Sequence, residues 1–112
     1  MQKTFYKKEA KKETVREGVS RKILAHHGGL MTVEVTFHKA SEDYGLHSHP
    51  HEQIAYVLKG SFEFLIQDTG ETCTVTEGDS IYFMPNSVHG GKPLEDESVL
   101  LDIFTPQRED FL

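Results

Sequence analysis

The sequence predicts an all-β protein in which short strands form a sandwich or a barrel. Of its 112 residues, 33 are Val, Ile, Thr, Phe or Tyr and only 13 are Ala or Leu, so strand formers far outnumber helix formers. Short apolar segments also recur at near-regular spacing between turn residues, which is typical of sandwiches and barrels. No segment has the sustained periodicity of an amphipathic helix.

The strand-length segments are bounded by turn residues in order along the chain. The first two, residues 22–25 and 31–37, flank Gly28-Gly29. Residues 53–58 and 61–67 are joined by Lys59-Gly60, which predicts a tight hairpin. The remaining strands are expected over residues 71–76, 80–84 and 99–105, with turn residues at 68–70, 77–79 and 85–86.

Length and charge narrow the class of protein further. We expect one domain with a single core, made of a charged arm over residues 1–20 and a barrel over residues 21–112. The net charge of −6 has the wrong sign for a nucleic-acid partner. No apolar run could cross a bilayer, so no membrane partner is expected. One cysteine, Cys73, and the absence of an apolar stretch after the basic start favour a cytoplasmic location.

Histidines gather in one short window. His47 and His49 are two residues apart, a spacing that can present both imidazoles to one metal ion from an extended chain. The hairpin that follows brings the start of its first strand beside them. A third histidine, His89, follows the turn at residues 84–88. The pattern indicates a metal site, although a bare His-x-His is equally compatible with a polar loop.

These motifs resemble those of the cupin superfamily, which implies a cupin β-barrel, that is, a jelly roll or double-stranded β-helix. The spacing of both cupin motifs is intact, with matches at His47, His49, Gln53 and Gly60 and then at Gly78, Met84, Asn86 and His89. The departures from the cupin pattern are Ser41 for Gly, Gln53 for Glu, Met84 for Pro, Asn86 for Gly and Pro93 for Asn. Asn86 can adopt the left-handed conformation that glycine supplies there, so the turn should survive.

A closer likeness is to the pectin-degradation protein KdgF family of uronate-linearising cupins. It rests on residues 47–53, 56–60, 62–64 and 100–112. The resemblance implies the metal ligands His47, His49, Gln53 and His89, and pocket residues Asp102, Phe104 and Arg108. It also implies the activity, which is opening of the ring form of 4,5-unsaturated monouronates, from pectin or alginate breakdown, into the linear keto form.

Strand parity distinguishes Gln53 from the neighbouring carboxylate Glu52. If Ala55 and Val57 face the barrel interior, Gln53 faces it as well, and Glu52 lies on the opposite face. Three neutral imidazoles and an amide would leave the charge of a divalent ion uncompensated, which favours an anionic sugar as substrate. The planar fork of Arg108 suits a carboxylate, unless Arg108 is only a surface charge.

Asp102 is the candidate acid/base residue. Alternation places it on one strand face with Leu100 and Phe104. An unpaired carboxylate buried there would cost several kcal/mol or bind a proton, so it needs a partner or a wet cavity. It could then move the protons that opening of a hemiacetal ring requires, with a structural hydrogen bond to the backbone as the alternative.

Three function classes stay open. The first is a redox-neutral, metal-dependent enzyme; the second is a small metal-dependent dioxygenase; the third is a non-catalytic sugar-binding cupin. Imidazole ligands are compatible with Zn, Ni, Fe, Mn and Cu. Outward-facing apolar residues such as Ile54, Tyr56 and Leu58 predict a homodimer that forms by packing of sheet against sheet.

Overall fold

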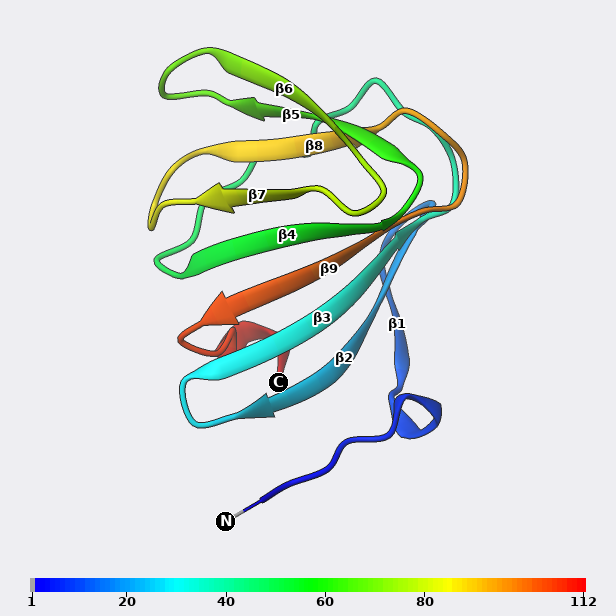
Figure 1. The fold of residues 1–112 in the computed structure, drawn as a ribbon, viewed down its shortest axis with the longest axis vertical. Coiled ribbons are helices and arrows are strands. Elements are labelled where there is room, and N and C mark those ends of the chain that lie inside the picture. The colour runs from blue at the N-terminus through cyan, green and yellow to red at the C-terminus, as the bar shows by residue number, and fades with distance from the viewer. Residues whose placement is uncertain (1) are drawn as a thin grey trace.

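The computed structural model describes residues 2–112 and consists of two antiparallel sheets that enclose an apolar core (Figure 1). One sheet has six strands in the order β1-β2-β3-β9-β4-β7, and the other has three in the order β6-β5-β8. The strands are β1 Lys12–Arg16, β2 Val19–His27, β3 Leu30–Phe37, β4 Glu52–Lys59, β5 Ser61–Ile66, β6 Glu71–Thr76, β7 Ser80–Phe83, β8 His89–Pro93 and β9 Ser98–Thr105. Two short 3-10 helices, η1 Lys7–Glu9 and η2 Glu109–Phe111, lie near the two ends of the chain.

The seven strands expected from the sequence are all present, each within three residues of its expected bounds at either end. Two further strands, β1 and β8, are not among those seven. β8 begins His89-Gly90-Gly91 and ends at Pro93, a composition that resembles a turn, yet it pairs with β5 along its whole length. β1 lies in the charged segment expected to be an arm, and β2 crosses the expected boundary between residues 20 and 21.

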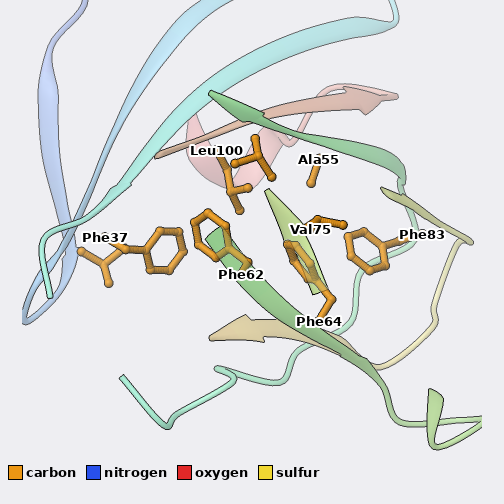
Figure 2. Close-up of a cluster of buried hydrophobic side chains, with 9 residues drawn as sticks. Phe37, Ala55, Phe62, Phe64, Val75, Phe83 and Leu100 are labelled. Atoms are coloured by element: carbon orange, nitrogen blue, oxygen red, sulfur yellow. The ribbon is translucent and has the colours of Figure 1, made fainter. Parts of the chain in front are cut away.

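Aromatic side chains from both sheets form the centre of the core (Figure 2). Phe62 of β5 makes an edge-on contact with Phe37 of β3, with ring centroids 5.2 Å apart. Phe64 lies 5.8 Å from Phe62 and 5.4 Å from Phe83 of β7. Each such pair adds to the free energy gained from burying apolar surface. This row of rings fills the space between the sheets and ends against His89, whose ring stacks on Phe83 at 3.9 Å.

Gly60 and Asn86, two residues of the cupin motifs, have positive φ angles in the turns where they lie. Gly60 links β4 to β5 with φ of 80°, and a Cβ there would collide with the side chain of Ser98. Asn86 has φ of 66°, which confirms the conformation expected where other cupins have glycine. Both turns hold strands that carry site residues. Within residues 2–112, neither helix is long or apolar enough to cross a membrane.

Candidate active site

Two neighbouring histidines, His47 and His49, come together with the distant His89 at one end of the barrel. His47, in the loop before β4, and His89, at the start of β8, are joined by two backbone hydrogen bonds of 2.9 Å. The ring centroid of His89 lies 4.7 Å from that of His47 and 5.1 Å from that of His49. One ligating atom from each of the three lies within 4.8 Å of the other two. The expected grouping of these histidines is therefore present.

Backbone carbonyls determine which nitrogen of each imidazole carries the proton. Nδ1 of His47 lies 2.8 Å from the Gly45 carbonyl, and Nδ1 of His89 lies 3.0 Å from that of Ser87. Nδ1 of His49 lies 3.1 Å from the carbonyl of His51. Because a carbonyl only accepts hydrogen bonds, each Nδ1 must donate, and each neutral ring then has a lone pair on Nε2. This arrangement is typical of metal-binding histidines.

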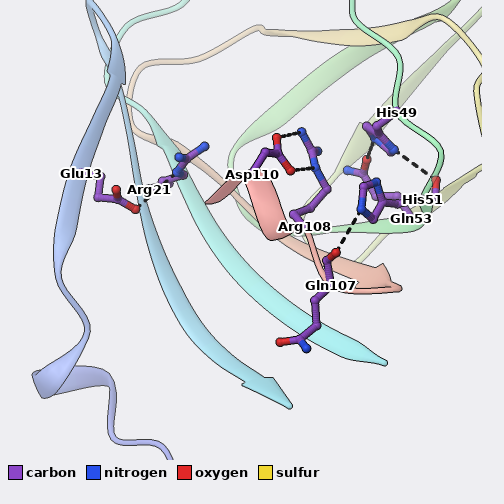
Figure 3. Close-up of polar contacts among 8 residues, drawn as sticks. All are labelled: Glu13, Arg21, His49, His51, Gln53, Gln107, Arg108 and Asp110. Carbon is purple, nitrogen blue, oxygen red and sulfur yellow. Dashed lines mark hydrogen bonds and ion pairs between the residues drawn. The ribbon is translucent and has the colours of Figure 1, made fainter. Parts of the chain in front are cut away.

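The side-chain oxygen of Gln53 adds a fourth lone pair beside the three histidines. Nε2 of Gln53 donates to Oδ1 of Asp102 at 2.8 Å. This hydrogen bond turns the Gln53 Oε1 toward Nε2 of His49, at 2.9 Å (Figure 3). Two acceptors at this distance repel each other unless a cation or a proton lies between them. Nε2 of His89 is buried and has no hydrogen-bond partner within residues 2–112. The donor set therefore fits a divalent transition-metal ion.

Burial favours the neutral, metal-binding form of the His49 and His89 imidazoles. Desolvation, followed by the positive charge of a protonated His47, lowers the pKa of His89 to about 4. Desolvation followed by the charge of Arg108 lowers the pKa of His49. Neutral rings at physiological pH need lose no proton to bind a metal ion.

The central strands β4 and β9 place Gln53 and Asp102 on the inner face. Gln53, Ala55 and Val57 are buried, whereas Glu52 is exposed and accepts a 2.6 Å hydrogen bond from the Tyr82 hydroxyl. The parity prediction is therefore confirmed for β4. On β9, which pairs with β4, alternation buries Asp102 with its neighbours two residues away, Leu100 and Phe104, as expected.

Asp102 is a buried carboxylate whose only hydrogen-bond donor within residues 2–112 is Gln53. Burial is the largest cause that shifts its pKa and raises it to about 7, while the Gln53 hydrogen bond and the charge of Arg108 oppose the shift. The group can therefore hold or release a proton near neutral pH.

Arg108 lies beyond β9, next to the same pocket. Its guanidinium lies 5.1 Å from the ring centroid of Phe104 and 4.2 Å from that of Phe111. Its Nε and Nη2 donate to the two carboxylate oxygens of Asp110 at 3.1 and 2.9 Å (Figure 3). Only 12% of its side chain is exposed, so Arg108 is not a freely solvated surface charge.

One pocket between the sheets connects these groups. Its wall includes the predicted residues His47, Gln53, His89, Asp102, Phe104 and Arg108, whereas His49 lies behind the wall with its ring 5.6 Å from that of Phe104. Sequence reasoning missed the part of the wall contributed by β1, β2 and η2, which includes Arg16, Arg21 and Phe111. Arg16 lies in a short Thr-Val-Arg segment within a highly charged stretch, and Phe111 lies in the C-terminal stretch that resembles KdgF proteins, but neither signal indicated a place in the pocket.

Two antiparallel sheets that enclose a pocket with a histidine cluster at its end define a cupin. Residues 33–104 match the family model described as the cupin domain, and the chain belongs to this family. It is 41% identical over 113 residues to the pectin degradation protein KdgF of Dickeya dadantii (strain 3937), with all of both chains covered.

Solved structures agree with this assignment. KdgF from Halomonas sp. is 34% identical over 100% of both chains, with a TM-score of 0.89. An RmlC-like cupin from Shewanella frigidimarina is 32% identical, covers 99% of this chain and 97% of its own, and has a TM-score of 0.86. The similarity to KdgF proteins expected from the sequence is therefore confirmed.

Proposed function

We propose that this protein is a metal-dependent, redox-neutral enzyme that converts 4,5-unsaturated monouronates, from pectin or alginate breakdown, into the linear keto form. The proposal rests on one observation: three imidazoles and the Gln53 amide oxygen lie close together, beside the buried carboxylate of Asp102. The full-length similarity to a protein named for pectin degradation supports the substrate class.

We assign His47, His49, Gln53 and His89 as ligands of one divalent transition metal, which can be Zn, Ni, Fe, Mn or Cu. When bound, the metal supplies a positive charge that polarises a sugar oxygen. None of the four side chains is anionic, so the protein ligands neutralise none of that charge. An anionic sugar is therefore favoured over a neutral one.

Asp102 is assigned as the acid/base residue. Opening of the ring requires a proton to leave the anomeric hydroxyl and another to reach the ring oxygen or the enol carbon. Gln53 donates to Oδ1, so Oδ2 of Asp102 is the oxygen that can take up and return a proton. Gln53 thus also fixes the orientation of the carboxyl group in the pocket.

Phe104 and Arg108 are assigned to substrate binding. The Phe104 ring is buried against His49 and gives the pocket an apolar wall. Asp110 occupies the Nε–Nη2 edge of Arg108, and the guanidinium keeps its other N–H groups for sugar oxygens. The contact with Asp110 also holds the guanidinium in place, which lowers the entropy lost when substrate binds.

We also propose a cytoplasmic homodimer. Ile54, Tyr56 and Tyr82 are 42%, 36% and 48% exposed on the outer face of β4 and β7, which supports packing of two sheets against each other. A monomer by light scattering at micromolar concentration would contradict the dimer. The single cysteine suits a reducing compartment.

Product analysis tests the proposed activity. The metal-loaded protein is incubated with unsaturated galacturonate in oxygen-free buffer, and the product is characterised by mass spectrometry and NMR. We expect an isomer of the substrate that lacks the C4=C5 double bond. A product that contains added oxygen atoms, formed only in air, would indicate the dioxygenase. Binding with no product would indicate a sugar-binding cupin.

A further inference from the structure

A single irregularity in β1 places an exposed, positively charged side chain, Arg16, in the wall of the active-site pocket. β1 pairs with β2 in register from Lys12 to Thr14, but the register shifts before Arg16, which lies opposite Val19. In a regular strand, Arg16 would share the outward face of Lys12 and Thr14. Val15 is the extra residue of a β-bulge, because it has no partner in β2. A β-bulge re-aims the side chain that follows it, which here is Arg16.

The pocket lining shows the result of the bulge. Val15 and Arg16 both line the same pocket as His47, His89 and Asp102, although adjacent strand residues normally point to opposite faces. The Nη2 atom of Arg16 lies 2.9 Å from the position that a Cβ on Gly45 would occupy. The carbonyl of Gly45 in turn accepts the hydrogen bond from Nδ1 of His47. Arg16 therefore packs against the loop that orients a candidate metal ligand.

Arg16 differs from the other two arginines of this pocket because it has no anionic partner within residues 2–112. Arg108 is bound to Asp110 through two hydrogen bonds. Nε of Arg21 lies 3.5 Å from Oε1 of Glu13 (Figure 3). The Arg21 guanidinium lies 3.8 Å from the ring centroid of Phe111. Among the aromatic rings of residues 2–112, the guanidinium of Arg16 faces Phe37 alone, at 6.0 Å from the ring centroid.

We propose that Arg16 is a specificity residue that binds the carboxylate of the anionic sugar at the β1–β2 side of the pocket. This inference rests on the proposed function for the identity of the ligand. The guanidinium can donate two parallel hydrogen bonds to one carboxylate, and those bonds are charge-assisted. The carboxylate is thereby held by β1 and β2, while the metal cluster and Asp102 face the reacting part of the sugar. The charged segment near the N-terminus thus contributes directly to substrate recognition.

The test compares two sugars that differ only at C6. Calorimetric titration of the metal-loaded full chain with D-galacturonate and D-galactose should show tighter binding of galacturonate. Arg16→Gln should weaken galacturonate binding about 10- to 100-fold, the range for a lost hydrogen bond to a charged group, and leave galactose binding unchanged. Arg16→Lys keeps the positive charge but cannot donate two parallel hydrogen bonds to one carboxylate. Its affinity for galacturonate should therefore lie between those of the wild type and Arg16→Gln.

Lys12→Gln is the matched control, because it removes the same charge from the outward face of the same strand, opposite Lys22. It should bind both sugars as the wild type does. The proposal is overturned if the wild type does not distinguish the two sugars. It is also overturned if Arg16→Gln retains galacturonate affinity or loses affinity for both sugars equally.

Turnover separates this inference from the proposed function. With unsaturated galacturonate, Arg16→Gln should raise KM about 10-fold or more with a small change in kcat. A wild type that turns over this sugar and an Arg16→Gln variant with unchanged KM would refute the role of Arg16 alone. A wild type with no turnover would refute the proposed activity, yet a loss of galacturonate preference in Arg16→Gln would still support the binding site.

Discussion

The side-chain amide of Gln53 donates a 2.8 Å hydrogen bond to Asp102 across the paired strands β4 and β9. This bond directs the amide oxygen toward His49 and holds one carboxylate oxygen of Asp102. A single neutral residue thus connects the candidate metal ligands with the candidate acid/base residue. A glutamate at this position could still offer an oxygen to a metal ion, but it could not donate a hydrogen bond to Asp102 without a further proton.

The substitution Gln53→Glu tests this connection. The variant should still bind metal, because a carboxylate is a good ligand, but it removes one unit of net positive charge from the site. The KM for unsaturated galacturonate should rise about 10-fold, while metal content measured by plasma mass spectrometry stays stoichiometric. An unchanged KM would show that the charge of the site does not select the substrate.

Removal of a ligand histidine should empty the metal site. We expect His49→Ala and His89→Ala to lose stoichiometric metal after dialysis, because each deletes one of the Nε2 lone pairs. His51→Ala is the control, since Nε2 of His51 bonds to the carbonyl of Gln107. Retention of stoichiometric metal by both ligand variants would rule out the assigned centre.

Regular strand geometry explains how much of this centre could be predicted. Alternation alone distinguished Gln53 from Glu52 and placed Asp102 with Phe104, because both strands are regular where these residues lie. The conformation of Asn86 followed from its motif position in the same way. Arg16 could not be found by alternation, because a bulge reverses the parity of β1 at that residue.

Asp102 predicts a pH dependence of stability in protein stripped of metal. Its pKa is raised to about 7 in the folded state, against about 4 in an unfolded chain. Between these values the folded state binds the proton more tightly, so the contribution of Asp102 to stability falls as the pH rises from 4 to 7. Three pKa units correspond to at most about 4 kcal/mol.

The variant Asp102→Asn isolates the contribution of Asp102 ionisation to the pH dependence of stability, because an asparagine side chain cannot ionise. Denaturant unfolding of the two stripped proteins should give similar free energies of unfolding near pH 4, with the variant the more stable of the two at pH 8. A difference that does not change with pH would contradict the raised pKa of Asp102.

Arg108→Ala should affect binding more than chemistry. The side chain packs on Phe104 and Phe111 and offers donors to the pocket, so its loss weakens substrate and transition state alike. Steady-state kinetics should show a KM raised about 10-fold and a smaller decrease in kcat. A large loss of kcat at constant KM would instead place Arg108 among the groups that act on the transition state.

Other parts of the site depend on contacts that no local pattern encodes. Arg108 pairs with Asp110 in the turn at η2, and His89 stacks on Phe83 across the loop between β7 and β8, so neither contact follows from strand alternation. β8 was missed because Gly90 and Gly91 disfavour a strand in isolation. The packed sheet overrides that preference, since a Cβ at Gly91 would collide with the Phe64 ring.

The rate of loss of the C4=C5 ultraviolet absorbance of unsaturated galacturonate shows whether a bound metal and Asp102 together open the sugar ring. It is measured in oxygen-free buffer without nicotinamide, with stripped protein, metal-restored protein and metal-restored Asp102→Ala. We expect acceleration only after metal is restored, and a rate roughly 100-fold lower for Asp102→Ala at equal metal content. Equal rates for the stripped and restored wild type, or no acceleration with any of the five metals, would contradict the account.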